Sequence, residues 1–117
     1  TLLDDHRVGC QGRAGMPGTS EKLWSEACQV IPGGVNSPVR SWRAVGGGPV
    51  FITRARGAEI VDADGVAYLD FLGSWGPLIL GHAVPSVVEA IAQRAASGTS
   101  FGASTPIEVE MVGSWLR

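Results

Sequence analysis

Glycine and proline divide this chain into short segments. The sequence holds 17 glycines and 7 prolines in 117 residues, so glycine is about twice as frequent as its usual share of roughly 7%. Glycine adopts backbone conformations that other residues avoid, and proline removes a backbone donor, so both favour turns over long regular elements. We therefore expect one small domain in which much of the chain forms turns and close backbone approaches.

The bulk composition is that of a globular protein. The chain is 44% hydrophobic and 17% charged, with a formal net charge of -2, which differs from the large charge imbalance of disordered chains. Nothing in it is basic enough to predict binding to nucleic acid or to a membrane surface, and no apolar run approaches the roughly 20 residues that span a bilayer. Cys10 and Cys28 follow no metal-binding spacing, and we expect no disulfide framework. A cytoplasmic location is predicted.

A first helix is predicted over residues 21–31, with Ser20 as its N-cap. Pro32 and the following glycine pair end it. Residues 1–18 have no usable periodicity and are predicted to be an irregular tail. The apolar residues of the helix recur at helical spacing and define one face: Leu23, Trp24, Ala27, Val30 and Ile31.

Three short β-like runs follow, at residues 49–54, 58–62 and 66–71. Arg56-Gly57 and Asp64-Gly65 separate these runs and suit hairpin turns. The pattern therefore predicts a small antiparallel β-meander.

Two further helices are predicted after the meander. One runs from Pro85 to about Ser97, and the other begins at Pro106 after a capping box formed by Thr105 and Glu108. An N-terminal helix, a short antiparallel meander and two helices together make an α+β fragment.

The connector IPGGVNSPVR, residues 31–40, carries a cation on a stiffened backbone. The guanidinium of Arg40 is always charged, and its planar fork matches a carboxylate through two parallel hydrogen bonds. Ser37 can add a hydroxyl to the same anion, and Pro38 between them limits the backbone. The pattern indicates an anion-binding site, and the alternative is a solvent-exposed arginine beside a turn-forming serine.

Trp75 lies in the glycine-rich loop GSWGPLILGH, residues 73–82. An aromatic residue in such a loop often lines a pocket, where a rigid flat wall orients a ligand. The alternative is a tryptophan that fills a gap in the core.

The remaining candidates favour structural roles. Asp62, Asp64 and Asp70 lie at strand ends and are interpreted as turn formers. His82 has no carboxylate or cysteine near it in the sequence and is interpreted as structural. The single lysine, Lys22, lies on the polar side of the first helix, whereas a Schiff-base lysine needs a desolvated site.

Four segments of the sequence resemble the glutamate-1-semialdehyde 2,1-aminomutases, a pyridoxal-phosphate family among the class III aminotransferases. They are IPGGVNSPVR, VGGGP, GAEIVDADGVAYLDFLGSWGPLILGHAVP and GTSFGA. The resemblance runs from about residue 20 to residue 111. GGVNSPVR followed by GSWGP is very specific for the aminomutases, while the D-x-DG-x-x-Y-x-D and GH-x-x-P elements are shared more widely by class III enzymes.

The resemblance implies a piece of a fold type I α/β enzyme that is a homodimer when complete. This enzyme is an isomerase that converts an amino-aldehyde, glutamate-1-semialdehyde, to 5-aminolevulinate in tetrapyrrole (porphyrin) biosynthesis, with pyridoxal 5′-phosphate or pyridoxamine 5′-phosphate as cofactor. By resemblance, Ser37 and Arg40 match family positions that hold the substrate carboxylate. Trp75 matches an aromatic wall of the substrate pocket, and GTSFGA resembles a segment near the dimer interface and active site.

Other family features have no counterpart here. The family's Schiff-base lysine, its aspartate facing the pyridine nitrogen and its phosphate cradle lie further along the family sequence, so the fragment alone is expected to be inactive. Val84 stands where the family usually has histidine, and residues 1–18 and 113–117 do not follow the family pattern. We therefore expect residues 19–112 to be the N-terminal segment of such an enzyme. A class III aminotransferase for another amine and a non-catalytic remnant are the alternatives.

Overall fold

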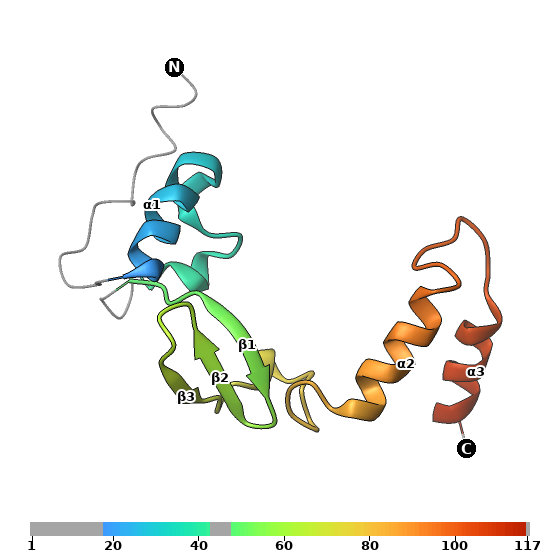
Figure 1. Ribbon diagram of the computed structural model, residues 1–117. Coiled ribbons are helices and arrows are strands. Elements are labelled where there is room, and N and C mark those ends of the chain that lie inside the picture. The colour runs from blue at the N-terminus through green and yellow to red at the C-terminus, as the bar shows by residue number, and fades with distance from the viewer. Residues whose placement is uncertain (1–17, 43–47, 117) are drawn as a thin grey trace. The chain divides into compact units, whose positions relative to one another are not determined.

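The computed structural model describes residues 18–42 and 48–116. The elements follow one another as a helix, two 3-10 turns, three strands, a third 3-10 turn and two helices (Figure 1). They form two compact units, one ending at His82 and one beginning at Ala83. Apart from Gly18, the predicted tail lies outside the described residues.

Helix α1, Thr19–Val30, confirms the first predicted helix but begins before the predicted start. Trp24 and Ala27 are buried as expected, whereas Val30 is 79% exposed and does not belong to the buried face. The helix ends at Ile31, whose backbone is extended because the next residue is Pro32.

The start of α1 differs from the predicted N-cap. Gly18 is the capping residue and makes no side-chain bond to the helix. Instead, the carboxylate of Asp64 accepts the amide of Thr19 at 2.5 Å and the amide of Ser20 at 3.1 Å. The free amides of the first helical turn are therefore satisfied by a residue 44 positions away, and the prediction that Ser20 caps the helix is wrong.

A tight contact follows α1 at the 3-10 turn η2, Pro32–Gly34. Gly34 has φ +73°, and a side chain there would lie 2.5 Å from Cζ3 of Trp24 and 2.9 Å from Sγ of Cys28. Cys28 is disulfide-bonded, whereas the sequence predicted no disulfide framework. The side chains of Trp24 and Cys28 therefore leave no room for a residue larger than glycine at position 34.

The three-stranded antiparallel sheet confirms the predicted meander. Its strands are β1, Ile52–Arg56, β2, Glu59–Asp62, and β3, Ala67–Leu69, hydrogen-bonded in the order β1-β2-β3. The register of β1 against β2 shifts between Ile52 and Arg54. Strand β1 begins later than its predicted run and extends to Arg56.

Asp62 organises the turn between β2 and β3. One carboxylate oxygen accepts the amides of Asp64 at 2.9 Å and Val66 at 2.8 Å, and the other accepts the hydroxyl of Tyr68 at 2.8 Å. Burial opposes the charge of Asp62, but these three donors hold its pKa below the usual value. The role of Asp62 as a turn former is therefore confirmed.

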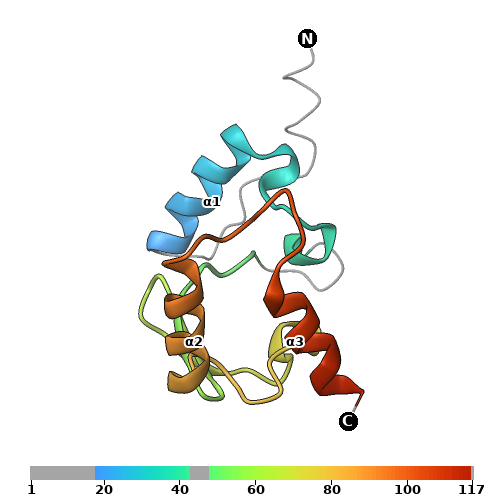
Figure 2. The ribbon, with the colours of Figure 1, turned by 90° about the vertical axis from the view of Figure 1, so that its right-hand side faces the viewer.

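The second unit consists of α2, Pro85–Ala95, and α3, Pro106–Trp115. Both begin with proline in the first turn, as predicted. Helix α3 continues past Gly113, and Thr105 and Glu108 bond each other through their side chains at 3.3 Å rather than capping the backbone. Figures 1 and 2 show α2 and α3 running in opposite directions, joined at one end by residues 96–105. No helix among residues 18–42 and 48–116 is long and apolar enough to cross a membrane.

Candidate substrate-binding site

The predicted anion-binding arm is built on two short 3-10 turns. η2 is followed by extended residues up to Ser37, and η3, Pro38–Ser41, carries Arg40 in its last turn. The Ser37 carbonyl accepts the Arg40 amide at 3.0 Å, and the Ser41 hydroxyl donates to the Pro38 carbonyl at 2.7 Å. These bonds fix the backbone that carries Ser37 and Arg40, as the two prolines in the sequence predict.

The side chain of Arg40 is exposed and, within the described part of the chain, forms no ion pair. Exposure does not single it out, because Arg54 and Arg56 on β1 are exposed as well. What distinguishes Arg40 is the proline-stiffened turn beneath it. An unpaired guanidinium on a fixed backbone can bind a carboxylate at a low cost in conformational entropy.

Trp75 lies in the 3-10 turn η4, Gly73–Trp75, where the backbone is strained. Ser74 and Trp75 have φ values of +53° and +66°, a region that residues other than glycine rarely adopt. Trp75 is 70% exposed and fills no gap in the core of the described residues. Strained non-glycine residues cluster at ligand sites, which supports the prediction for Trp75.

The structure places Ser37 and Arg40 together on one arm and Trp75 on a separate loop of the same unit. None of the cavities described here is lined by any of the three. A cavity of about 350 Å³ lies at the base of the Trp75 loop and is lined by Asp70, His82 and seven residues between positions 57 and 81. A shared substrate pocket for Ser37, Arg40 and Trp75 therefore stays a prediction.

Asp70 and His82 form a pair that the sequence analysis missed. Nε2 of His82 lies 2.6 Å from Oδ2 of Asp70, while Oδ1 of Asp70 accepts the amides of Leu72 at 2.8 Å and Gly73 at 3.0 Å. The hydrogen bond from His82 and these two amides hold the pKa of Asp70 below its usual value. The two residues are 12 positions apart, so a search among sequence neighbours of His82 could not find the carboxylate.

Asp64 is the second acidic residue with an unexpected role. The hydroxyl of Ser20 beside it and the amides of Thr19 and Ser20 lower its pKa below the usual 3.8. The prediction that Asp64 is a turn former missed this function, because the link joins the β2–β3 turn to the start of a helix far away in sequence.

The Asp64 link is expected to weaken in acid. Because the folded-state pKa is lowered, the stabilisation is fully present above the unfolded pKa near 3.8 and is lost as the pH falls through the lower folded value. The amides of α1 should therefore exchange more slowly in wild type than in D64N at about pH 6, and this difference should become smaller at about pH 3. An unchanged difference at both pH values would contradict this assignment.

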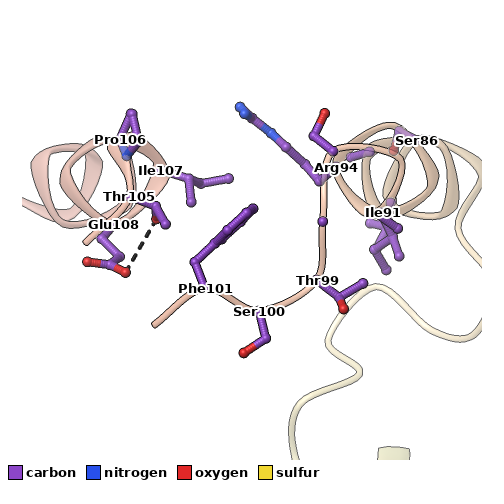
Figure 3. A pocket seen from close by; sticks show the side chains of 15 residues that line it. Ser86, Ile91, Arg94, Thr99, Ser100, Phe101, Thr105, Pro106, Ile107 and Glu108 are labelled. Carbon is purple, nitrogen blue, oxygen red and sulfur yellow. Dashed lines mark hydrogen bonds between the residues drawn. The ribbon is translucent and has the colours of Figure 1, made fainter. Parts of the chain in front are cut away.

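A groove of about 970 Å³ lies between α2 and α3 within the second unit (Figure 3). Ile91, Phe101 and Ile107 give it an apolar lining, and Arg94 contributes a charge. Gly98, with φ +117°, lets Phe101 fold inward, because a side chain there would lie 2.7 Å from the Phe101 ring. Arg94 pairs with Glu110 at 3.3 Å, but both side chains are exposed, so this ion pair contributes little stability.

Acidic, histidine and cysteine side chains of the described ranges form no group of three that could hold a metal ion. The sequence pattern predicts no metal-ligating residue.

Comparison with known proteins identifies the family. The family model for class-III aminotransferases matches residues 42–116. The chain is 58% identical over 97 residues to the glutamate-1-semialdehyde 2,1-aminomutase of Sorangium cellulosum, which covers 83% of this chain and 22% of that protein. It is 63% identical over 92 residues to the glutamate-1-semialdehyde 2,1-aminomutase of Roseiflexus castenholzii, covering 79% of this chain and 21% of that protein.

The fold comparison agrees with the sequence comparison. The structure matches that of a transaminase solved with PLP bound, with a TM-score of 0.67, 43% sequence identity, and coverage of 80% of this chain and 22% of that chain. The described elements thus match part of an aminotransferase structure, and the chain spans about a fifth of the length of the relatives it matches. Because the family model matches more than half of its residues, the chain belongs to the class-III aminotransferase family.

Proposed function

We propose that this chain supplies the N-terminal, substrate-binding part of a glutamate-1-semialdehyde 2,1-aminomutase. Such an enzyme is an isomerase that converts glutamate-1-semialdehyde to 5-aminolevulinate. The observation that carries the proposal is identity of 58% and 63% with two aminomutases over about four-fifths of the chain. A homodimer and a cytoplasmic location of the complete enzyme are part of the same proposal.

Ser37 and Arg40 bind the carboxylate of the substrate in this proposal. A carboxylate accepts two parallel hydrogen bonds from the Arg40 fork, and the Ser37 hydroxyl donates a third. The support is the fixed backbone of η3 and the exposed guanidinium, which forms no ion pair with residues 18–42 or 48–116. Trp75, exposed on its strained turn, packs against the carbon chain of the substrate and limits the orientations it can adopt.

The cofactor of the proposed enzyme is pyridoxal 5′-phosphate or pyridoxamine 5′-phosphate, which would supply the amino-transfer chemistry when bound. The described residues do not fit its covalent attachment. Lys22 is the single lysine of the sequence, and it is exposed on α1 rather than enclosed in a desolvated pocket. This chain therefore contributes substrate binding and not cofactor attachment in the proposal.

A hybrid enzyme tests the proposal. The aligned segment of this chain replaces the corresponding 92 residues of the Roseiflexus castenholzii aminomutase, to which it is 63% identical. We expect the hybrid to form 5-aminolevulinate and the 117-residue chain alone to form none, because Lys22 cannot hold the cofactor. A folded hybrid that binds the cofactor but forms no product would contradict the proposal.

A transaminase acting on another amine is the second candidate, because the structure also matches a transaminase at 43% identity. Product analysis separates the two. A transaminase needs a separate keto acceptor, whereas an aminomutase returns the amino group to the same molecule. Turnover of the hybrid that depends on an added keto acid would favour the transaminase.

Replacing Trp75 with alanine in the hybrid is expected to raise the KM for the amino-aldehyde about tenfold. An aromatic contact contributes about 0.5–1.5 kcal/mol beyond its buried area, and 1.4 kcal/mol is a factor of ten. Steady-state kinetics with purified hybrid measures the change. Trp75→Phe keeps a flat ring and serves as the matched control, so a KM near that of the unmodified hybrid is expected for it. Equal KM values for Trp75→Ala and the unmodified hybrid would exclude Trp75 from the pocket.

A further inference from the structure

The loop that carries Trp75 begins at Asp70 and ends at His82, and both ends are anchored to the same hairpin. The Asp70 amide donates to the Ala58 carbonyl at 2.8 Å. Gly57 and His82 exchange two backbone hydrogen bonds of 2.9 and 2.8 Å. The loop therefore leaves and rejoins the sheet at one place, the turn between β1 and β2.

The side chains of the two end residues bind each other across the base of this loop. Nε2 of His82 and Oδ2 of Asp70 are 2.6 Å apart, and the side chains are only 18% and 10% exposed. An ionised carboxylate can only accept hydrogen bonds, so Nε2 carries the proton and donates. The other oxygen accepts the amides of Leu72 and Gly73. Three N–H groups thus converge on one carboxylate.

Backbone hydrogen bonds lead from these two amides to Trp75. The Trp75 amide donates to the Leu72 carbonyl at 3.1 Å, and the Gly76 amide donates to the Gly73 carbonyl at 3.1 Å. The residues that Asp70 holds are therefore the residues that fix the turn under Trp75. This turn contains two strained residues, which persist only where surrounding contacts hold them.

The closure of the loop is tight. Gly81 has φ +84°, and a side chain at that position would lie 2.7 Å from the Gly57 carbonyl oxygen. The backbone next to His82 therefore packs directly on the hairpin at Gly57, and a residue with a side chain at position 81 would disturb this contact.

We propose that Asp70 and His82 are positioning residues whose hydrogen bond closes the loop 71–81 and thereby holds Trp75 in place against the substrate. The inference rests on the proposed function, since it requires Trp75 to contact the substrate. Neither Asp70 nor His82 touches the substrate in this arrangement. They act through the backbone of Leu72 and Gly73 on the orientation of the tryptophan.

Variants of His82 in the hybrid enzyme test the inference. His82→Leu removes the donor, and His82→Gln places an amide donor near the position of Nε2. We expect His82→Leu to raise the KM about tenfold with kcat within about threefold of the unmodified hybrid, because a misplaced binding group weakens substrate binding. His82→Gln should have a KM close to that of the unmodified hybrid. Hydrogen exchange of the peptide covering residues 71–82 should be faster in His82→Leu than in the unmodified hybrid. In His82→Gln, its rate should be close to that of the unmodified hybrid.

The outcomes separate the inference from the proposed function. A merely structural role would lower the fraction of active enzyme, and therefore kcat, without changing KM, and this result would overturn the inference. A large KM effect of Trp75→Ala without one of His82→Leu would overturn it as well, while leaving the proposed function intact. If neither Trp75→Ala nor Arg40→Ala changes KM, the proposed function fails. If the exchange of the loop peptide is also unchanged in His82→Leu, the inference that the Asp70–His82 hydrogen bond closes the loop fails as well. Should His82→Leu not fold, His82→Asn, whose shorter side chain cannot reach Asp70, is expected to give the same rise in KM.

Discussion

Replacing Arg40 with alanine in the hybrid enzyme is expected to raise the KM for the amino-aldehyde about 10- to 100-fold. Hydrogen bonds to charged groups contribute about 1.5–3 kcal/mol, and each 1.4 kcal/mol is a factor of ten. The loss falls on the substrate, because the proposed partner of Arg40 is the substrate carboxylate. The affinity for the cofactor, measured by spectroscopic titration of the apoenzyme, should stay within about twofold.

Two controls make the Arg40 result specific. Arg40→Lys keeps the charge but loses the planar fork, so its KM should lie between those of the hybrid and Arg40→Ala. Arg54→Ala removes an exposed arginine from β1, outside the proposed site, and should leave KM unchanged. Equal losses of substrate and cofactor affinity in Arg40→Ala would remove Arg40 from the proposed carboxylate site.

Replacing Gly34 with alanine is expected to destabilise the first unit by about 2–5 kcal/mol. A positive φ costs a residue with a Cβ about 1–2 kcal/mol, and inserting a methyl group into a packed contact costs about 1–3 kcal/mol. The new Cβ would lie 2.5 Å from the buried Trp24 ring, so the ring or the turn must move. Hydrogen exchange of α1 in the hybrid enzyme measures the loss, because local opening of this unit exposes the helix amides.

Gly65→Ala is the matched control for Gly34→Ala. Gly65 has a similar φ, +85° against +73°, but no atom beyond its chain neighbours lies within 4 Å of the position that a Cβ would take. This variant therefore shows the cost of the backbone alone, about 1–2 kcal/mol. Similar losses for the two variants would mean that the contact between Gly34 and Trp24 has no energetic importance.

Much of the local structure follows from the sequence. The hairpin turns at Gly57 and Gly65 have positive φ, which is what the glycines in the sequence predict, and they set the β-meander. Proline at positions 85 and 106 marks the beginnings of α2 and α3, because proline is pre-organised for the first turn of a helix. The helix ending before Pro32 and the stiffened turn under Arg40 were predicted for the same reason: these features depend on neighbouring residues only.

The residues of the candidate site, Ser37, Arg40 and Trp75, were chosen from the chemistry of their side chains and from a family resemblance. Trp75 is exposed and Arg40 lies on a hydrogen-bonded turn, and their roles in substrate binding stay predictions. The pairing of Asp70 with His82 was missed, because it joins the two ends of a loop. The Asp64 carboxylate was interpreted as part of its own turn, because its partners at Thr19 and Ser20 are far away in sequence.

The sequence by itself determined the short elements and their turns, because glycine and proline restrict the backbone locally. It also determined the family of this protein, because the family motifs are contiguous stretches of sequence. Only the tertiary structure decided which carboxylate accepts a hydrogen bond from which amide or side chain. Asp64 caps a distant helix, and Asp70 closes the loop of Trp75 through His82. A hydrogen bond depends on the distance and direction between two groups in space, and no spacing along the chain specifies these until the backbone between them has folded.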